Sequence, residues 1–388
     1  MGREVVIVAY GRSAVCRSRK GAFANTHPIE YSAQVLNGVL NKIPQLDKNE
    51  IEDIIMGCAV QHYQTSMNIA KSVAARAGLP ESVAAYTMNR FCSSGLQAIA
   101  NAVAAIAADH ADVIVAGGVE DMSHTYEPYP EEYQDAWLNE HAPGAYMPMG
   151  ITAENVVKHC GVTREEMDAM AAASHAKAYK AQQEGKLAPS IIPVTVMGPD
   201  GEEVCVTQDE GIRPGTTVEK LAALRPCFIP AEEGGTVTAA TSSQTSDAAA
   251  FVVLMEAEKA KRLGIKPIAI MRSFSVAGCD ATMMGLGPIY AAPKALKRAG
   301  LSIDDMDVIE LNEAFAAQAI PCIKELKMNP DKVNPYGGAM ALGHPMGATG
   351  AFLTCKALDY LQDTEGRYAM VTMCIGGGMG AAGIFERI

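Results

Sequence analysis

Short apolar runs alternate with longer segments of helical periodicity in the first part of the chain. The runs at residues 5–8, 51–56 and 112–116 predict strands, and residues 86–90 predict a further extended segment. Helical spacing follows residue 95, where four apolar side chains recur three or four positions apart: Leu96, Ile99, Val103 and Ile106. Strands that are apolar throughout are typical of a sheet buried on both faces, so this region predicts a parallel α/β sheet covered by helices.

The same order of elements returns near the end of the chain. The later strands are predicted at residues 268–271, 308–311 and 368–373, with helices at 292–298 and from about 346 to 361. In both regions a helix is followed by an apolar strand and a pair of glycines. The offset of roughly 250–260 residues is too long for a solenoid repeat and indicates a tandem duplication. We therefore expect two similar α/β halves.

The segment between the halves has a different composition. Residues 121–150 are rich in Tyr, Pro, His and Met and lack a long periodic pattern. Thr163 and Glu166 form a predicted capping box at the start of a helix. We therefore predict an N-terminal half at 1–120 that is completed by 246–265, an inserted loop domain at 121–245 and a C-terminal half at 266–388. The length of 388 residues is enough for two or three domains.

Composition and charge narrow the class of protein. The net charge of −12 is spread along the chain, which argues against a nucleic-acid surface, since that surface requires a basic stripe. The N-terminus has no pattern of a secretion signal, and no apolar window reaches the length of a membrane span. The ten cysteines form no C-x-x-C pair and no zinc-ligand spacing. We expect free thiols, no metal site, no membrane and a cytoplasmic location.

Cys92 is the first candidate for chemistry. It stands between an extended segment and the start of a helix, and two serines and a glycine follow it. Free backbone N–H groups and the positive end of a helix favour a thiolate at such a position. The alternative is a small buried residue with no chemical role, which is the usual state of a cysteine.

Three further positions complete a possible acyl-transfer site. His344 lies in a glycine-rich loop before a helix, at the position that Cys92 occupies in the first half, and an imidazole can activate a thiol. Cys374 and the glycines 376–378 follow an apolar strand, where backbone N–H groups can bind an oxyanion. Asn312 also follows a strand and can hold a water, although it can equally be an ordinary helix cap.

The residues around these positions resemble the signature blocks of the thiolase family. The blocks are Asn89-Arg-Phe-Cys-Ser-Ser-Gly-Leu96, Asn312-Glu-Ala-Phe-Ala316, Gly337-Gly-Ala-Met-Ala-Leu-Gly-His-Pro-Met-Gly-Ala-Thr-Gly350 and Cys374-Ile-Gly-Gly-Gly-Met-Gly380. They occur in the family's order, and the resemblance covers nearly the whole chain. It implies two duplicated βαβαβαββ core domains with an inserted loop domain, assembled as homodimers or homotetramers.

The resemblance also implies roles for the candidate residues. Cys92 accepts the acyl group, His344 activates it, and Cys374 is the acid and base for the second product. Asn312 holds a water that forms one oxyanion hole together with His344. The N–H groups of Cys92 and Gly376 form the other hole.

Coenzyme A is the implied co-substrate, with no permanently bound cofactor. By resemblance, Arg213 lies near its adenine and phosphate part and Ser243 near its pantetheine arm. Four residues resemble those of the pocket wall, with plain core packing as the alternative: Met149, Phe228, Met284 and Phe315.

Details of the sequence favour the degradative 3-ketoacyl-CoA thiolases. Met147-Pro148-Met149-Gly150 replaces the His-Met-Gly of short-chain acetoacetyl-CoA thiolases. The stretches Thr241-Ser-Ser243, Arg17-Ser-Arg-Lys-Gly-Ala-Phe23 and Phe315-Ala-Ala-Gln-Ala-Ile-Pro-Cys322 resemble those of the degradative enzymes. Ala240 and Ala248 in place of usual glycines, and Tyr336 in place of a common Asn, are departures from the family pattern. The expected reaction is reversible thiolytic cleavage of a 3-ketoacyl-CoA into acetyl-CoA and a shortened acyl-CoA. The alternatives are a biosynthetic acetoacetyl-CoA thiolase, a condensing enzyme of fatty-acid synthesis and a non-enzymatic member, of which the last would be expected to have lost Cys92, His344 or Cys374.

Overall fold

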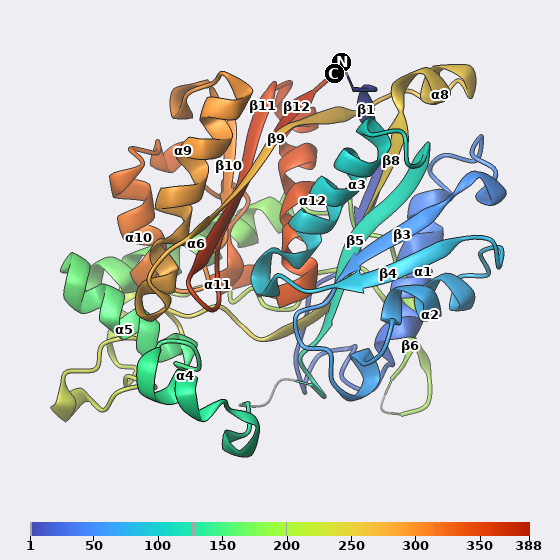
Figure 1. Cartoon of the computed structure of the whole chain (residues 1–388). Helices are drawn as coiled ribbons and strands as arrows, with labels where there is room; N and C mark the ends of the chain where they lie inside the picture. The colour runs from blue at the N-terminus through green and yellow to red at the C-terminus, as the bar shows by residue number, and fades with distance from the viewer. Residues whose placement is uncertain (1, 126–128, 199) are drawn as a thin grey trace.

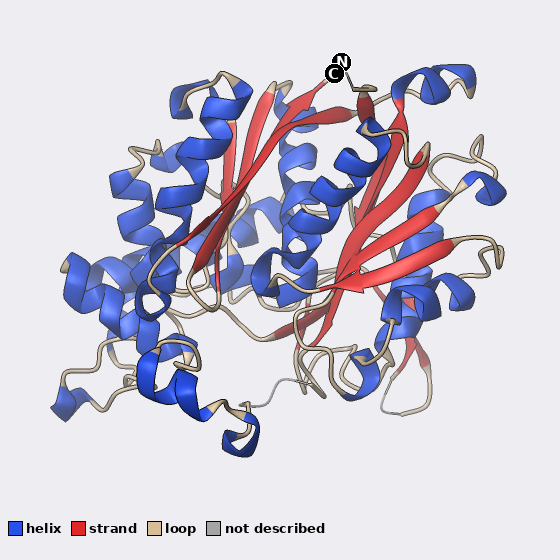
Figure 2. Cartoon of the chain, viewed as in Figure 1, coloured by secondary structure: helices blue, strands red, loops and turns tan. Residues whose placement is uncertain are grey.

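The computed structural model describes residues 2–125, 129–198 and 200–388, so parts of the segment 121–245 lie outside it. One ten-stranded mixed sheet runs through the molecule, and a two-stranded hairpin stands apart from it (Figures 1 and 2). The strands are β1 (Val5–Arg12), β2 (Cys16–Arg17), β3 (Asp53–Gly57), β4 (Ala84–Met88), β5 (Val113–Asp121), β6 (Val194–Met197), β7 (Glu203–Val206), β8 (Ser246–Glu256), β9 (Ala269–Gly278), β10 (Val308–Leu311), β11 (Tyr368–Ile375) and β12 (Met379–Arg387).

Helices cover both sides of each half of this sheet and also form much of the segment 121–245 (Figure 2). They are α1 (Pro28–Leu40), α2 (Ile69–Arg76), α3 (Ser94–Ala107), α4 (Ala136–His141), α5 (Met149–Cys160), α6 (Arg164–Gln183), α7 (Val218–Ala222), α8 (Ala257–Arg262), α9 (Gly287–Ala299), α10 (Ala316–Glu325), α11 (Ala339–Leu342) and α12 (Met346–Thr364). The predicted capping box at the start of α6 is confirmed, because Thr163 and Glu166 exchange hydrogen bonds there.

The strand order confirms the duplication. From one edge the strands follow β4, β3, β5, β8 and β1, and from the other edge β10, β11, β12 and β9. β1 and β9 meet in the middle through the pair Ile7 and Ala269. The second half therefore mirrors the first, except at its edge, where the counterpart of β4 is a single bridge between Ile309 and Val333.

The expectation of a parallel sheet is wrong for the centre of the molecule. Only the pairs β3–β4, β3–β5 and β10–β11 are parallel, and every pairing of β8, β9 and β12 that the structure describes is antiparallel. β12 follows β11 after the short glycine turn at 376–378, and strands joined by such a turn must run in opposite directions. Apolar composition reports burial on both faces but not strand direction.

Four of the predicted strands, β1, β5, β9 and β11, are longer than their apolar runs. β5 continues past its glycines to Glu120 and Asp121, and both carboxyl groups are buried. β11 continues to Ile375 and includes Cys374 as a buried residue of the strand. The strand ends therefore carry polar and reactive groups into the interior.

The halves of the sheet enclose a central pair of helices, α3 and α12. Figure 1 shows α9 and α10 outside β10–β12, α1 and α2 outside β3–β8, and α3 beside α12 between the two halves of the sheet. A single apolar cluster joins α3 and α12 to strands of both halves. The molecule thus has five layers, and the central layer carries the helix starts that follow Cys92 and His344.

Glycine permits the close approach of α3 and α12. A Cβ at Gly350 would lie 2.2 Å from the backbone nitrogen of Leu96, and one at Gly95 would lie 2.8 Å from that of Ala351. Both distances are far inside van der Waals contact, and the atoms met are backbone atoms that cannot turn away. The contact of α3 with α12 therefore requires residues without side chains at these positions.

Buried polar contacts attach the segment 121–245 to the core. Arg12 of β1 makes a bidentate ion pair with Asp209, and both side chains are buried. Asp209 also accepts the backbone N–H of Val15.

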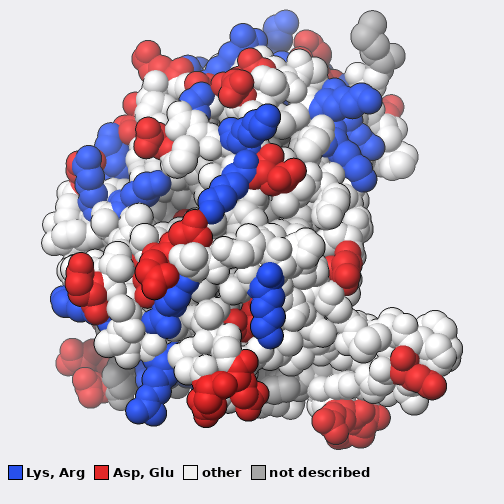
Figure 3. Space-filling view, turned by 90° about the vertical axis from the view of Figure 1, so that its left-hand side faces the viewer, with Lys and Arg blue, Asp and Glu red and all other residues white. Residues whose placement is uncertain are grey.

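The surface over α9 and α10 carries charges of both signs. On this face, Lys and Arg side chains are interspersed with Asp and Glu (Figure 3).

Gly350→Ala is expected to lower the free energy of unfolding by about 2–3 kcal/mol, the upper range for overpacking a core. The reason is the clash with the backbone of Leu96. Urea unfolding followed by circular dichroism measures the effect. Gly278→Ala is the control, since its nearest atom would be 4.0 Å away, and it should change stability by less than about 0.5 kcal/mol. Equal stability of the two variants would contradict the packing argument.

Candidate active site

Four segments from the two halves of the chain converge beside the starts of α3 and α12. They are the 3-10 turn η3 (Phe91–Ser93), the end of β10 with Asn312, the loop around His344, and the turn that joins β11 to β12. η3 packs against α12 and β11, which brings Cys92 next to elements of the second half. The duplication is the reason for this convergence, because equivalent loops lie at equivalent ends of the mirrored strands.

Cys92 is half-buried in η3, one residue before the N-cap of α3. Removal from water raises the pKa of its thiol to about 11, although backbone N–H groups of Gly376 and of Cys92 itself act in the opposite direction. Backbone N–H groups therefore favour the thiolate as the sequence predicts, but desolvation outweighs them. Those same contacts place the N–H groups of Cys92 and Gly376 next to the sulfur.

His344 is buried and held at both ring nitrogens. Its Nδ1 lies 2.7 Å from Oγ1 of Thr349 in the first turn of α12, and its Nε2 lies 3.4 Å from Nδ2 of Asn312. Burial lowers the pKa of His344 to about 4, so its imidazole is neutral at pH 7. A neutral imidazole can take a proton from a thiol.

Asn312 has one free hydrogen-bonding atom in the interior. Its Nδ2 faces His344, whereas its buried Oδ1 has no hydrogen-bond partner among the described residues. A buried polar atom of this kind commonly binds an ordered water. The side chain is therefore suited to hold a water beside the imidazole.

Cys374 lies near Cys92 at the end of β11. It is fully buried, and desolvation together with the nearby charge of a Cys92 thiolate raises its pKa well above that of an ordinary thiol. The mutual influence of the two thiols means that they do not ionise independently. The structure thus places the two thiols close together, and η3 with Cys92 packs against α12, the helix that begins directly after the loop of His344.

Three of the four predicted pocket-wall residues pack in or against the apolar cluster that contains Cys374, and the fourth, Phe228, is exposed and joins it only through Phe315. Met284 and Phe315 belong to the same buried cluster as Cys374, and Met149 packs against that cluster. Phe228 makes an edge-to-face contact with Phe315, with ring centroids 5.9 Å apart. Met149 also approaches the turn after β11, since a Cβ on Gly376 would lie 3.6 Å from its sulfur.

The two residues predicted to contact coenzyme A lie on loops of the segment 121–245. Ser243 is half-buried, and its backbone N–H donates to the carbonyl of Ala314. Arg213 is exposed on a loop, where its backbone N–H donates to Nδ1 of His175. Neither side chain has a described contact with Cys92, His344 or Cys374.

Gln244 supports the loop of His344 and was not identified from the sequence. The side-chain amide of Gln244 donates to the backbone carbonyls of Gly211 and Met340. The backbone carbonyl of Gln244 accepts the backbone N–H of His344. This links the loop that carries Arg213 to the loop that carries His344. Nothing in the sequence separates Gln244 from other polar residues of the segment, since its partners are backbone atoms.

Glu120 is the second buried group that the sequence analysis did not identify. Its carboxylate accepts the backbone N–H groups of Ala59, Val60 and Gly347, the last at 2.7 Å in the first turn of α12. Desolvation raises the pKa of Glu120 to about 7 despite these bonds. An acidic residue directly after an apolar strand was a signal that could have pointed to it.

Within the described residues, no group of three or more metal-ligating side chains has the geometry to hold an ion. The same part of the chain contains no helix whose length and apolar character would suit a membrane span. All ten cysteines are free thiols, as the sequence predicts.

The fold and this group of residues define a class: an α/β enzyme of two duplicated halves with a thiol and an imidazole at their junction. Residues 5–258 match the family description "Thiolase, N-terminal domain", and residues 265–387 match "Thiolase, C-terminal domain". The chain belongs to the thiolase family, which makes it an acyltransferase enzyme.

Similar proteins cover the whole chain. A protein of Idiomarina loihiensis named 3-ketoacyl-CoA thiolase is 45% identical over 100% of both chains, and one of Bacillus subtilis with the same name is 46% identical over 99% of both. The crystal structure of the Bacillus anthracis acetyl-CoA acetyltransferase superposes with a TM-score of 0.92 at 37% identity, covering 100% of this chain and 99% of that one.

Alkylation of Cys92 by iodoacetamide is expected to become faster with pH through pH 10, by about tenfold per pH unit. The thiol reacts as a thiolate, and its pKa of about 11 keeps that form rare below this range. Mass spectrometry of the peptide that contains Cys92 gives the rate, and Cys92→Ala identifies the modified site. A plateau in the rate below pH 8 would contradict a thiol that is neutral at rest.

Glu120→Gln is expected to change how stability depends on pH. The folded-state pKa of Glu120, about 7, lies above that of an unfolded Glu near about 4.3, so its favourable contribution is complete below about pH 4.3 and is lost as the pH rises through about 7. The wild-type free energy of unfolding should therefore fall by up to about 4 kcal/mol relative to the variant across this window. Urea unfolding at several pH values measures this, and parallel curves would rule out the shift.

Proposed function

We propose that this thiolase cleaves 3-ketoacyl-CoA substrates with coenzyme A, giving acetyl-CoA and an acyl-CoA that is two carbons shorter. The observation that carries this proposal is the proximity of the Cys92 and Cys374 thiols, with the neutral imidazole of His344 in the loop before α12, the helix against which η3 packs. A reaction that makes an acyl-enzyme and also protonates a carbon fragment needs a nucleophile and a separate acid. The names of the relatives from Idiomarina and Bacillus subtilis support the same substrate class.

In the first step, the thiol of Cys92 transfers its proton to His344 and attacks the keto carbon. The pKa values are consistent with proton transfer during the attack, because thiol and imidazole are both neutral at rest. A tetrahedral oxyanion then forms on the former keto oxygen. The N–H groups of Cys92 and Gly376 lie beside the sulfur, where they can donate to that oxygen.

In the second step, the carbon–carbon bond breaks and the acyl group stays on Cys92. The departing fragment is the enolate of acetyl-CoA, whose negative charge rests on the thioester oxygen. The imidazole of His344 and a water held by Oδ1 of Asn312 supply the donors for this oxygen. Cys374 gives its proton to the enolate carbon, so acetyl-CoA leaves as a neutral product.

In the third step, the thiolate of Cys374 takes the proton of an incoming coenzyme A. The new coenzyme A thiolate attacks the thioester on Cys92, and the acyl-CoA leaves while the sulfur of Cys92 recovers its proton. The high pKa of Cys374 makes its thiolate a strong base once formed. Both thiols thus return to their starting state, as a reversible cycle requires.

Met149, Phe228, Met284 and Phe315 are proposed to enclose the reacting thioester, and Ser243 and Arg213 to contact the coenzyme A arm. Met149, Met284 and Phe315 belong to or pack against the apolar cluster of Cys374 and would exclude water, which strengthens hydrogen bonds to a developing charge. We assign the chain to fatty-acid degradation and to the cytoplasm, with a homodimer or homotetramer as the assembly. We also propose the division into 1–120 with 246–265, 121–245 and 266–388.

A biosynthetic acetoacetyl-CoA thiolase is the second candidate. The similarity to the acetyl-CoA acetyltransferase of Bacillus anthracis favours it, since that protein shares the fold over its whole length. Pro148, the N-cap residue of α5, stands in place of the His in the His-Met-Gly of the short-chain enzymes. This difference favours the degradative enzyme.

Rates of thiolysis for 3-ketoacyl-CoAs of increasing length test the function. The degradative enzyme should cleave six- to ten-carbon substrates at least as well as acetoacetyl-CoA, and a biosynthetic enzyme should accept only the shortest. Cys92→Ala is expected to abolish turnover at every length, whereas Cys205→Ala, on the exposed strand β7, should match the wild type. Acyl transfer by the Cys92→Ala variant at near wild-type rate would refute the assigned nucleophile.

A further inference from the structure

The side chain of Glu120 is a buried carboxylate that contacts both halves of the chain. It lies near the end of β5, and its Oε2 accepts the backbone N–H groups of Ala59 at 2.9 Å and of Gly347 at 2.7 Å. Its Oε1 accepts the N–H of Val60 at 3.1 Å. Gly347 belongs to the first turn of α12, in the second half of the chain. One oxygen atom therefore joins the two halves, and no step of the proposed reaction uses this carboxylate.

The bond to Gly347 acts on the turn of α12 that orients the imidazole. His344 lies three residues before Gly347, and its Nδ1 is 2.7 Å from Oγ1 of Thr349 in the same turn. A Cβ on Gly347 would lie 2.7 Å from the backbone nitrogen of Ala59, so the two backbones touch and leave no room for a side chain. Glu120 thus holds the turn to which the ring of His344 is bonded.

The bond to Ala59 continues to the turn that carries Cys92. The carbonyl of Ala59 accepts the side-chain amide of Asn89 at 2.8 Å, and Oδ1 of Asn89 accepts the N–H of Phe91 at 2.7 Å. Phe91 directly precedes Cys92 and has a φ of 43°, a conformation that a bulky residue keeps only where its surroundings hold it. The hydrogen bonds that start at Glu120 therefore end at a strained residue beside Cys92.

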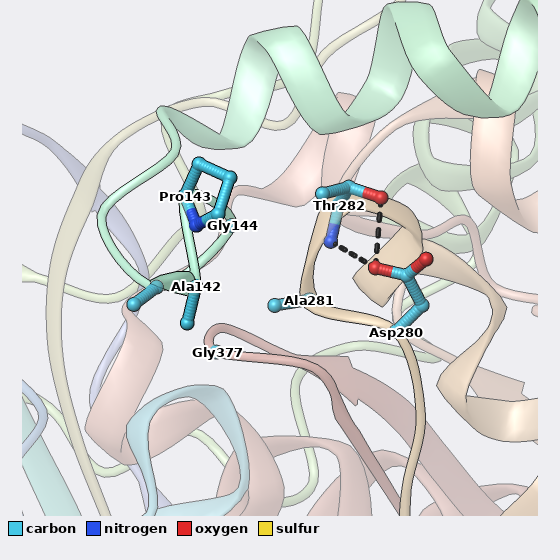
Figure 4. Close-up of a pocket in the computed structure, with 8 residues that line it drawn as sticks. Ala142, Pro143, Gly144, Asp280, Ala281, Thr282 and Gly377 are labelled. Atoms are coloured by element: carbon cyan, nitrogen blue, oxygen red, sulfur yellow. Dashed lines mark hydrogen bonds between the residues drawn. The ribbon is translucent and has the colours of Figure 1, made fainter. Parts of the chain in front are cut away.

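Other contacts hold the turn that joins β11 to β12. The carbonyl of Gly378 accepts the N–H of Cys279 at 2.8 Å. Figure 4 shows Gly377 of this turn at the edge of a cavity of about 390 Å³. Among the described residues, none that lines this cavity bonds to the carboxylate of Glu120. A change at Glu120 should therefore leave this turn and its cavity in place.

We propose that Glu120 is a positioning residue, which keeps the turn of Cys92 aligned with the turn of α12 that orients His344. The inference rests on the proposed roles of these two residues. The alternative is a buried acid that only stabilises the fold. Because proton transfer from a thiol to an imidazole requires aligned groups, a shift of about 1 Å can cost about 100-fold in rate. Loss of this alignment should lower kcat in the folded enzyme, which a purely stabilising role would not do.

Three variants test the proposal through kcat and KM per folded molecule, with the folded fraction measured by circular dichroism. Glu120→Leu leaves three backbone N–H groups without their acceptor, so kcat should fall at least about 100-fold while the KM for coenzyme A stays within about threefold. Glu120→Gln should keep kcat within about tenfold of wild type, since its amide oxygen can replace Oε2. Asn89→Asp, at an exposed position, loses the donor to Ala59 and should lower kcat about tenfold.

Glu256→Leu is the matched control. Glu256 is a buried carboxylate before α8 that accepts two backbone N–H groups within the same half of the chain. Like Glu120→Leu, this variant should unfold at a lower urea concentration than the wild type. Its kcat per folded molecule should stay within about twofold of wild type, because Glu256 does not join the halves.

The outcomes separate this inference from the proposed function. If the wild type cleaves no 3-ketoacyl-CoA, the proposed function fails and this inference with it. If the wild type is active and folded Glu120→Leu keeps its kcat, the carboxylate only stabilises the fold and the inference alone is overturned. If Glu120→Leu does not fold, Asn89→Asp decides. A wild-type kcat in Asn89→Asp would contradict the inference, and a fall of about tenfold with an unchanged KM would support it.

Discussion

The contact of α3 with α12 is the constraint on which the rest of the structure depends. Each helix begins beside a residue with a reactive side chain, Cys92 before α3 and His344 before α12. The axes can approach closely because glycines face the neighbouring backbone at the crossing, among them Gly95 and Gly350. A contact that tolerates no Cβ restricts how the two helices can pack, and an acyl-transfer site needs accurately placed groups.

Burial then sets the chemical state of the groups that this contact brings together. Desolvation raises the pKa of both thiols and lowers that of His344, so all three are neutral before substrate arrives. Neutral groups in a dry site cost less to bury than a thiolate–imidazolium pair, and their charges need develop only during reaction. Glu120 is a buried carboxyl in the same region, where three backbone N–H groups stabilise its ionised form.

Buried polar contacts help to attach the segment between the halves to the core. The pair of Arg12 with Asp209 joins it to β1, and the side chain of Gln244 links Gly211 to Met340. Because removal of one partner of a buried ion pair leaves the other charge unpaired in the interior, loss of either Arg12 or Asp209 would be strongly destabilising. Arg213 and Ser243, which are proposed to contact coenzyme A, belong to the same segment. Their positions therefore depend on these contacts.

The sequence by itself determined the element types, the duplication and the identity of the candidate groups. Apolar runs indicate which segments are buried, and the blocks around Cys92, Asn312, His344 and Cys374 indicate the candidate reactive groups. Both can be recognised in short stretches of the sequence. Strand direction, the thiol state of Cys92 and the roles of Glu120 and Gln244 were decided only by the tertiary structure. Each of these depends on which distant backbone and side-chain atoms surround a group and exclude water from it, and a linear pattern contains no record of those distances.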